Sequence, residues 1–190
     1  MRRTSLYSRR CRRNAVRRSG ESRMGDRSDG TPLVVVCGLP GVGKSTVSRA
    51  IADRLDAAVL RTDVVRKELF EEPAYTAEET AAVYDELLSR ARERLYAGPV
   101  VLDGTFEGRD RRADARDLAA STGASFRLVR VDCDEAVVEE RIAERDGVSD
   151  ADLDVHRRFR DRFDPVEMDH LVVDNSGTEA ATRRRIEEAF

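Results

Sequence analysis

The sequence predicts an α/β fold in which a parallel sheet is covered on both faces by helices. Short apolar segments alternate with longer segments of helical periodicity along most of the chain. A glycine-rich loop joins the first apolar segment to the first helical one, in strand, loop, helix order. The length of 190 residues suits one domain of this kind and leaves no room for a second.

Each element follows from a local pattern. Strands are expected at 33–37, 57–60, 100–103, 126–131 and 170–173. After the glycine-rich loop, the first helix carries Val47, Ile51 and Leu55 on one face. Further helices are expected at 63–70, 76–97, 109–121, 135–145, 151–162 and 178–189. In the longest, at 76–97, one face carries Val83, Leu87, Ala91 and Leu95.

The N-terminal segment has a different composition from the rest. Residues 1–23 hold nine arginines against one acid, Glu21, whereas residues 24–190 have 25 basic and 36 acidic side chains, a net charge of −11. Residues 1–30 are therefore expected to be a basic, disordered extension, and residues 31–190 the folded domain. Three interpretations compete: sequence that precedes a true start at Met24, a basic arm for nucleic acid or membrane surfaces, and a targeting peptide. We favour the first.

Cysteine spacing and hydropathy indicate the cellular environment in which the protein works. Cys11, Cys37 and Cys133 lack the spacing of metal ligands and read as reduced thiols of a cytoplasmic protein. No apolar run approaches the length of a membrane span, so no membrane partner is expected.

The glycine-rich loop fits the phosphate-binding pattern G-x-x-x-x-G-K-[ST]. Its residues are Gly38, Leu39, Pro40, Gly41, Val42, Gly43, Lys44 and Ser45. The glycines allow backbone N–H groups to surround phosphate oxygens, and the following helix directs its positive end at the same charge. Lys44 is expected to reach the β- and γ-phosphates, Ser45 to bind Mg²⁺, and Thr46 to support the first helical turn. The alternative is an ordinary glycine-rich turn with a solvated lysine.

Asp103 ends an apolar strand and is expected to help hold Mg²⁺, directly or through water. Gly104 follows it, where hydrolytic motor ATPases place a glutamate that activates water. The pattern therefore favours phosphoryl transfer over hydrolysis. The alternative role for Asp103 is to cap a turn.

Asp63 and Arg66 lie three residues apart, so they share a face in the first turn of a helix. This turn follows a strand and lies beside the crevice where open α/β sheets bind ligands. A carboxylate there can take the proton of an acceptor hydroxyl, and the guanidinium can bind an anionic group of the substrate. The alternative is a helix cap with a surface ion pair.

Further candidates lie in the C-terminal half. Arg141 and Arg145, four residues apart, can stabilise charge on the transferred group from a mobile flap, or belong to a solvated helix face. Asn175 lies in a loop and is a candidate contact for adenine. His156 and His170 are expected to be structural or surface residues.

These motifs together resemble the adenylate-kinase-like branch of P-loop phosphotransferases, above all the AAA-domain, polynucleotide-kinase-like and gluconate-kinase-like group. The similarity runs from about Leu33 to the end of the chain. The resemblance implies a five-stranded parallel sheet with the phosphate-loop strand in the middle, in the three-layer P-loop NTPase fold, and a small helical lid bearing Arg141 and Arg145. It also implies ATP as donor, with Asp63 as general base and Arg66 as ligand of the acceptor's phosphate.

The expected function is therefore ATP-dependent transfer of the γ-phosphate to a hydroxyl of a small molecule, with Mg²⁺. One alternative is a 5′-hydroxyl polynucleotide kinase, for which Arg109, Arg111 and Arg112 can form a local basic patch despite the negative domain. The other is an ATP-binding switch that transfers little. The sequence names neither the acceptor nor the oligomeric state.

Overall fold

The computed structural model describes residues 30–143 and 150–190. Five strands form one parallel sheet in the order β2-β3-β1-β4-β5, as expected, with the strand before the phosphate loop in the middle. The strands are β1 (Pro32–Cys37), β2 (Ala58–Arg61), β3 (Val100–Asp103), β4 (Ser125–Asp132) and β5 (Leu171–Asp174). The carboxyl ends of these strands meet at one edge of the sheet, where open α/β sheets bind ligands.

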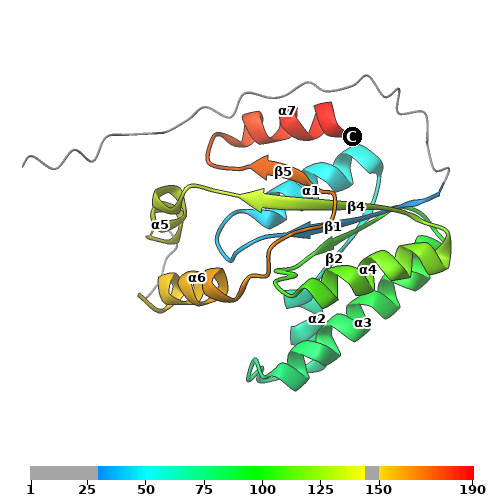
Figure 1. The fold of residues 1–190 in the computed structure, drawn as a ribbon, viewed down its shortest axis with the longest axis horizontal. Coiled ribbons are helices and arrows are strands. Elements are labelled where there is room, and N and C mark those ends of the chain that lie inside the picture. The colour runs from blue at the N-terminus through cyan, green and yellow to red at the C-terminus, as the bar shows by residue number, and fades with distance from the viewer. Residues whose placement is uncertain (1–29, 144–149) are drawn as a thin grey trace, which may run out of the picture.

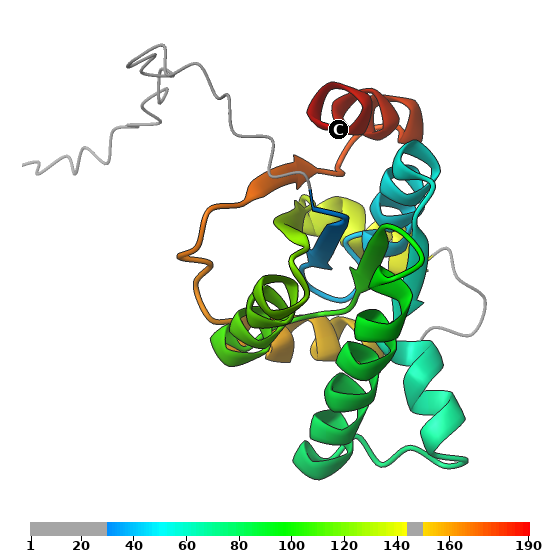
Figure 2. The ribbon, with the colours of Figure 1, turned by 90° about the vertical axis from the view of Figure 1, so that its right-hand side faces the viewer.

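Helices cover both faces of the sheet, as Figure 1 and the turned view in Figure 2 show. They are α1 (Lys44–Leu55), α2 (Thr62–Leu69), α3 (Ala77–Leu95), α4 (Arg109–Thr122), α5 (Glu135–Ala143), α6 (Asp150–Arg162) and α7 (Glu179–Ala189). Helices α1 and α7 pack on one face, and α3 and α4 on the other, with α2 beside α3. Helices α5 and α6 lie beyond the carboxyl ends of the strands, so they are placed to cover the phosphate loop.

The middle strand β1 joins the two halves of the core. Val34 and Val36 face the side of α1 and α7, whereas Leu33, Val35 and Cys37 face the side of α3 and α4, and all five side chains are buried. A parallel strand that is covered on both faces needs such a continuous apolar run. The loop that follows β1 therefore starts from the buried centre of the sheet.

Helix α3 confirms the apolar stripe that the sequence predicts. Val83, Leu87, Ala91 and Leu95 are all buried in the core cluster on this face. The Thr76 hydroxyl accepts a hydrogen bond from the Glu79 amide at 3.2 Å, so the helix begins with a capped first turn. The observed bounds of the other helices and strands differ from the expected ones by a few residues at most.

The region expected to form the lid is described in part. Helix α5 ends at Ala143 among the described residues, and the predicted site residue Arg145 lies outside them. Helix α6 contacts the phosphate loop: Nδ1 of His156 donates to the Pro40 carbonyl at 2.7 Å, and only 5% of His156 is exposed. His156 is therefore structural, as expected. No helix in the described ranges is long and apolar enough to cross a membrane.

Candidate active site

The N-terminus of α1 is open to an anion. Gly43, with a φ of 88°, precedes the helix and makes no side-chain cap, and the first turn contains no acidic residue. The backbone N–H groups of this turn and the positive end of the helix dipole are thus available to a phosphate. A Cβ on Gly43 would lie 2.1 Å from Nδ2 of Asn175, so both the backbone angle and the close approach require glycine.

Lys44 lies inside the loop that precedes it. Its Nζ donates a hydrogen bond to the Leu39 carbonyl at 2.8 Å, which holds the side chain over the loop. Burial lowers the pKa of Lys44 to about 8, while the nearby Asp103 carboxylate acts in the opposite direction. A bound phosphate would supply the negative charge that a buried ammonium needs.

Ser45 and Asp103 meet although 58 positions separate them in the chain. The Ser45 hydroxyl donates to Oδ2 of Asp103 at 2.9 Å, and Asp103 is only 5% exposed. Burial raises the pKa of Asp103, and the Ser45 hydrogen bond and the charges of Lys44 and Arg61 oppose that shift. A hydroxyl and a carboxylate oxygen this close together are hard donors, so these two residues fit a Mg²⁺ ion.

Arg61, to which the sequence analysis assigned no role, links the predicted site residues. Its Nη2 lies 2.8 Å from Oδ2 of Asp63 and 3.3 Å from the Ser45 hydroxyl, and its Nε lies 3.5 Å from Oδ2 of Asp103. Arg61 is the last residue of β2, and strand ends in a parallel sheet gather at the ligand-binding edge. The place of Arg61 at the end of a predicted strand was the one signal in the sequence that could have identified it as a site residue.

Asp63 and Arg66 both lie on α2 but have different surroundings. The Asp63 side chain is 55% exposed, and Arg61 directs it toward Ser45 and Asp103. Arg66 is buried and donates to the Thr80 hydroxyl of α3 at 3.2 Å. The two residues thus face the phosphate loop and a neighbouring cavity, respectively.

This cavity, the α2–α6 cavity, has a volume of about 850 Å³. Its walls come from the phosphate loop, the start of α2, the start of α3, the loop after β3, and α6. Its lining residues are Pro40, Thr62, Arg66, Tyr75, Thr76, Ala77, Thr80, Tyr84, Thr105, Glu107, Val155, Phe159 and Arg162. The size is that of a small-molecule site.

Arg141 and Asn175 meet on the other side of the phosphate loop. Nη2 of Arg141 donates to the Asn175 carbonyl at 2.9 Å. Nδ2 of Asn175 donates to the Val42 carbonyl at 2.9 Å, and its Oδ1 accepts from the Thr182 hydroxyl at 2.7 Å. The Asn175 side chain therefore braces the phosphate loop against the start of α7, a role that the sequence analysis did not foresee.

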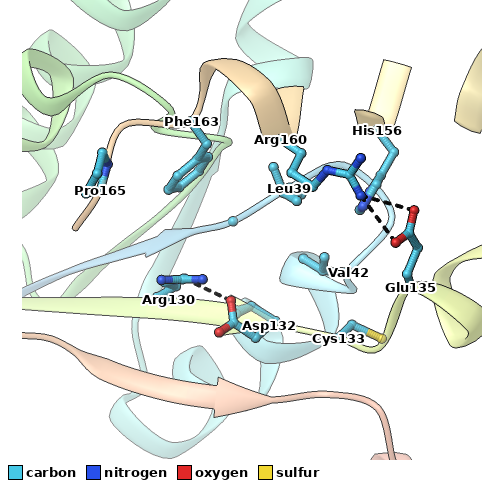
Figure 3. Close-up of a pocket in the computed structure, with 12 residues that line it drawn as sticks. Leu39, Val42, Arg130, Asp132, Cys133, Glu135, His156, Arg160, Phe163 and Pro165 are labelled. Carbon is cyan, nitrogen blue, oxygen red and sulfur yellow. Dashed lines mark hydrogen bonds and ion pairs between the residues drawn. The ribbon is translucent and has the colours of Figure 1, made fainter. Parts of the chain in front are cut away.

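A second cavity, of about 450 Å³, lies between the carboxyl end of β4 and α6 (Figure 3). Its charged side chains pair with one another: Arg130 with Asp132 at 2.8 Å, and Arg160 with both carboxylate oxygens of Glu135 at 3.2 Å. Leu39, Val42, Phe163 and Pro165 supply apolar walls.

The arginines at 109–112 do not form the basic patch that a nucleic-acid acceptor would favour. Arg112 is 1% exposed and donates to four carbonyl groups, those of Phe106, Glu107, Asp164 and Pro165, at 2.7–3.0 Å. Arg111 lies 3.5 Å from Asp85 and 3.7 Å from Asp114, and Arg109 lies 3.1 Å from Glu167. Arg112 is thus a buried structural residue, and acids offset the other two charges.

Comparisons with known proteins found similar sequences and similar folds. Uncharacterized proteins of Mycobacterium tuberculosis and Mycobacterium bovis are 38% identical over 137 residues, which cover 65% of this chain but only 28% of each relative. A gluconokinase from Sinorhizobium meliloti superposes with a TM-score of 0.62 at 25% identity, covering 85% of this chain and 91% of that one.

Two solved structures of lower sequence identity share the fold. A sugar kinase from Janibacter has a TM-score of 0.63 at 20% identity, covering 82% of this chain and 91% of its own. The APS kinase of Mycobacterium tuberculosis, in complex with AMPPNP and APS, has a TM-score of 0.67 at 18% identity. The match covers 84% of this chain and 96% of that one. The profile of the AAA domain matches residues 33–166, most of the described site included. The chain therefore belongs to this AAA domain family, and its fold is that of the adenylate-kinase-like P-loop kinases.

Proposed function

We propose that this protein is an ATP-dependent phosphotransferase that moves the γ-phosphoryl group to a hydroxyl of a small molecule. One observation carries the proposal: Arg61 links Asp63 to Ser45 and Asp103, which brings a carboxylate beside the phosphate loop, and the neighbouring Thr62 lines the α2–α6 cavity. A donor site and an acceptor cavity thus share one reactive edge of the sheet.

The donor half consists of the phosphate loop, Gly38 to Thr46, and the start of α1. Backbone N–H groups there bind the phosphates of ATP, and Lys44 binds the β- and γ-phosphates. Ser45 and Asp103 would hold Mg²⁺, which supplies neutralisation of the charge that develops on the phosphates. The AMPPNP in the solved APS kinase, an ATP analogue, supports ATP as donor by analogy.

The acceptor half consists of Asp63 and Arg66. Asp63 accepts the proton of the acceptor hydroxyl while the oxygen of that hydroxyl forms a bond to the γ-phosphorus. The bond from the γ-phosphorus to the bridging oxygen breaks at the same time and releases ADP. Arg66 binds the acceptor. Arg141, next to Asn175, is proposed to close over the nucleotide together with Arg145, which lies outside the described residues.

A small acceptor accounts for the cavity better than a polynucleotide does. The cavity size is that of a single small molecule, and acids offset the charge of Arg109 and Arg111. The sugar kinase, gluconokinase and APS kinase names among the structural neighbours point the same way. We also propose a cytoplasmic location, because Cys37 and Cys133 are free thiols.

The test is transfer of labelled γ-phosphate from ATP with Mg²⁺ to pools of sugars, sugar acids, nucleosides, aminoglycosides and 5′-hydroxyl oligonucleotides. We expect product in one small-molecule pool. In Asp63→Ala, turnover should fall by about 10²- to 10⁴-fold while ATP binding, measured by calorimetry, is retained, because a positioned base is lost.

The matched control is Asp117→Ala, since Asp117 is an exposed aspartate on α4 that pairs with its neighbour Arg116. This variant should transfer at the normal rate. Normal turnover in Asp63→Ala would refute the base assignment, and transfer only to oligonucleotides would replace the small acceptor with a polynucleotide. Tight ATP binding with no transfer to any pool would favour an ATP-binding switch.

A further inference from the structure

The cavity shown in Figure 3, the β4–α6 cavity, is separate from the proposed acceptor site. Its volume of about 450 Å³ suits a small molecule. It shares no lining residue with the α2–α6 cavity, and its apolar lining consists of Leu39, Val42, Val131, Phe163 and Pro165. The proposed transfer reaction assigns this cavity no role.

The charged side chains in the described lining of the β4–α6 cavity are paired with one another. Nε of Arg130 lies 2.8 Å from Oδ1 of Asp132, and Nη1 of Arg160 lies 3.2 Å from each carboxylate oxygen of Glu135. A charged molecule would lose its hydration shell here without meeting a free opposite charge. The cavity therefore favours a neutral occupant.

His156 supplies a hydrogen-bond acceptor to this cavity. Its Nδ1 donates to the Pro40 carbonyl at 2.7 Å, so Nε2 of the neutral ring carries a lone pair. Nε2 has no partner among the residues whose side chains the structure describes, although His156 is only 5% exposed and lines the cavity. A buried acceptor without a donor is unfavourable, and an occupant with an N–H or O–H group would satisfy it.

The wall formed by Phe163 and Pro165 is held from behind by Arg112. Cζ of Arg112 lies 5.5 Å from the centroid of the Phe163 ring, and its Nη2 donates to the Pro165 carbonyl at 3.0 Å. Because Arg112 is itself buried, these contacts fix the wall before an occupant binds. A preformed aromatic wall favours a flat ring that can stack on it.

The β4–α6 cavity also adjoins the phosphate loop. The side chains of Leu39 and Val42 line it, while the Leu39 carbonyl accepts a hydrogen bond from Lys44 at 2.8 Å. His156 bonds to the next carbonyl of the loop, that of Pro40. An occupant that packs on Leu39 and bonds to His156 would therefore favour this loop conformation, in which the Lys44 ammonium bonds to the loop itself.

We propose that the β4–α6 cavity is an effector site for a neutral aromatic molecule that carries an N–H or O–H donor. The donor bonds to Nε2 of His156, and the ring packs on Phe163 and Leu39. The occupant favours the bond of Lys44 to the Leu39 carbonyl, whereas ATP favours Lys44 on its phosphates. The effector therefore weakens ATP binding, whatever the phosphoryl acceptor is.

Indole and 1-methylindole are matched probes of the donor, since a methyl group replaces the N–H hydrogen. The chain has no tryptophan, so the fluorescence of the probe reports its binding directly. Indole should bind about three- to tenfold more tightly than 1-methylindole, because only indole donates to His156. Phenol should displace indole, whereas benzoate, which is charged, should not.

The ring nitrogens of histidine locate the probe. The chain has two histidines, so ¹⁵N-histidine labelling gives two sets of ring signals, which His170→Gln assigns. Indole should shift the Nε2 signal of His156, and 1-methylindole should shift it less. His170 should not respond, because it lines neither cavity. No shift at His156, or equal shifts with both probes, overturns the site.

Phe163→Ala and Phe159→Ala are a matched pair of variants, since Phe159 lines the α2–α6 cavity instead. Phe163→Ala should weaken indole binding about three- to tenfold, and Phe159→Ala should leave it unchanged. His156→Phe should remove the preference for indole over 1-methylindole. The reverse result in the two phenylalanine variants would place indole in the α2–α6 cavity and reject the site. If a variant does not fold, the His156 signal of the unaltered protein still decides.

Calorimetry with AMPPNP and Mg²⁺ tests the effector role. Saturating indole should raise the Kd of AMPPNP by about fivefold or more, and AMPPNP should raise the Kd of indole by the same factor. AMPPNP that does not bind, or whose Kd indole leaves unchanged, overturns the effector role. The test does not depend on phosphoryl transfer, so a protein without kinase activity would still show the coupling.

Discussion

At the scale of single residues, Arg61 organises the reactive edge. Its guanidinium contacts the Ser45 hydroxyl and the carboxylates of Asp63 and Asp103, the groups proposed for metal binding and proton transfer. Motif patterns assign roles to those three residues and none to Arg61. Its importance comes from the meeting of two strand ends, because Arg61 lies opposite Asp103 in the β2–β3 register.

We expect Arg61→Gln to lower the Mg²⁺ concentration for half-maximal transfer by about two- to fivefold. That factor corresponds to about 0.5–1 kcal/mol, the free energy of a partly exposed ion pair that Mg²⁺ no longer has to displace. The guanidinium contacts the same oxygens of Ser45 and Asp103 that would bind the metal, so it competes with Mg²⁺. Turnover should fall at saturating Mg²⁺, because Asp63 loses the group that directs it.

A Mg²⁺ titration of initial rates measures both effects. The control is Arg90→Gln, since Arg90 pairs with Glu68 and Glu86 at a distance from the phosphate loop. An unchanged Mg²⁺ midpoint in Arg61→Gln would show that the arginine does not compete for the metal site.

At the scale of elements, Arg112 connects two segments of the chain. One is the loop between β3 and α4, whose Thr105 and Glu107 line the α2–α6 cavity; the other is the segment that follows α6. The four carbonyl groups that Arg112 binds belong to these segments, two on each side. The residue therefore anchors the segment after α6 to α4 and to the loop after β3.

Arg112→Met should destabilise the protein by about 2–5 kcal/mol, because buried carbonyl groups lose charged hydrogen-bond donors. Urea unfolding measures the change. Arg116→Met, on the same helix, is the control: Arg116 is exposed and pairs only with its neighbour Asp117 among the described residues, so its effect should stay within about 0.5 kcal/mol. Equal effects in the two variants would contradict the anchoring role.

At the scale of the whole molecule, the site exists only in the folded chain. Its parts come from β1 and α1, from the ends of β2 and β3, and from the loop that holds Asn175, which lies 133 positions from its partner Val42. A ligand that binds this assembly has no equivalent site in the unfolded chain. Nucleotide binding should therefore stabilise the entire domain by mass action.

With AMPPNP and Mg²⁺ at a hundred times the Kd, the free energy of unfolding should rise by about 2.7 kcal/mol. Lys44→Ala should lose most of this gain at the same concentrations, because the ammonium no longer binds the phosphates. Thermal and urea unfolding, with and without nucleotide, measure this gain in the free energy of unfolding. A full gain in Lys44→Ala would show that the nucleotide binds elsewhere.

The sequence alone determined the layered α/β fold and the phosphate-loop motif, and it named the residues that we propose bind the donor. These features are local: an apolar strand, a stripe such as Val83 to Leu95 and an eight-residue motif each report on neighbours in the chain. The central place of β1, expected from the resemblance, was also confirmed.

Only the tertiary structure decided what the arginines do. In a chain with so many of them, sequence does not distinguish the buried Arg112 and Arg66 and the bridging Arg61 from solvated charges. Their roles depend on carbonyl groups, carboxylates and hydroxyl groups from distant segments. Local periodicity records which face of an element is buried, whereas the partner of a charged group is set by how the segments close around it.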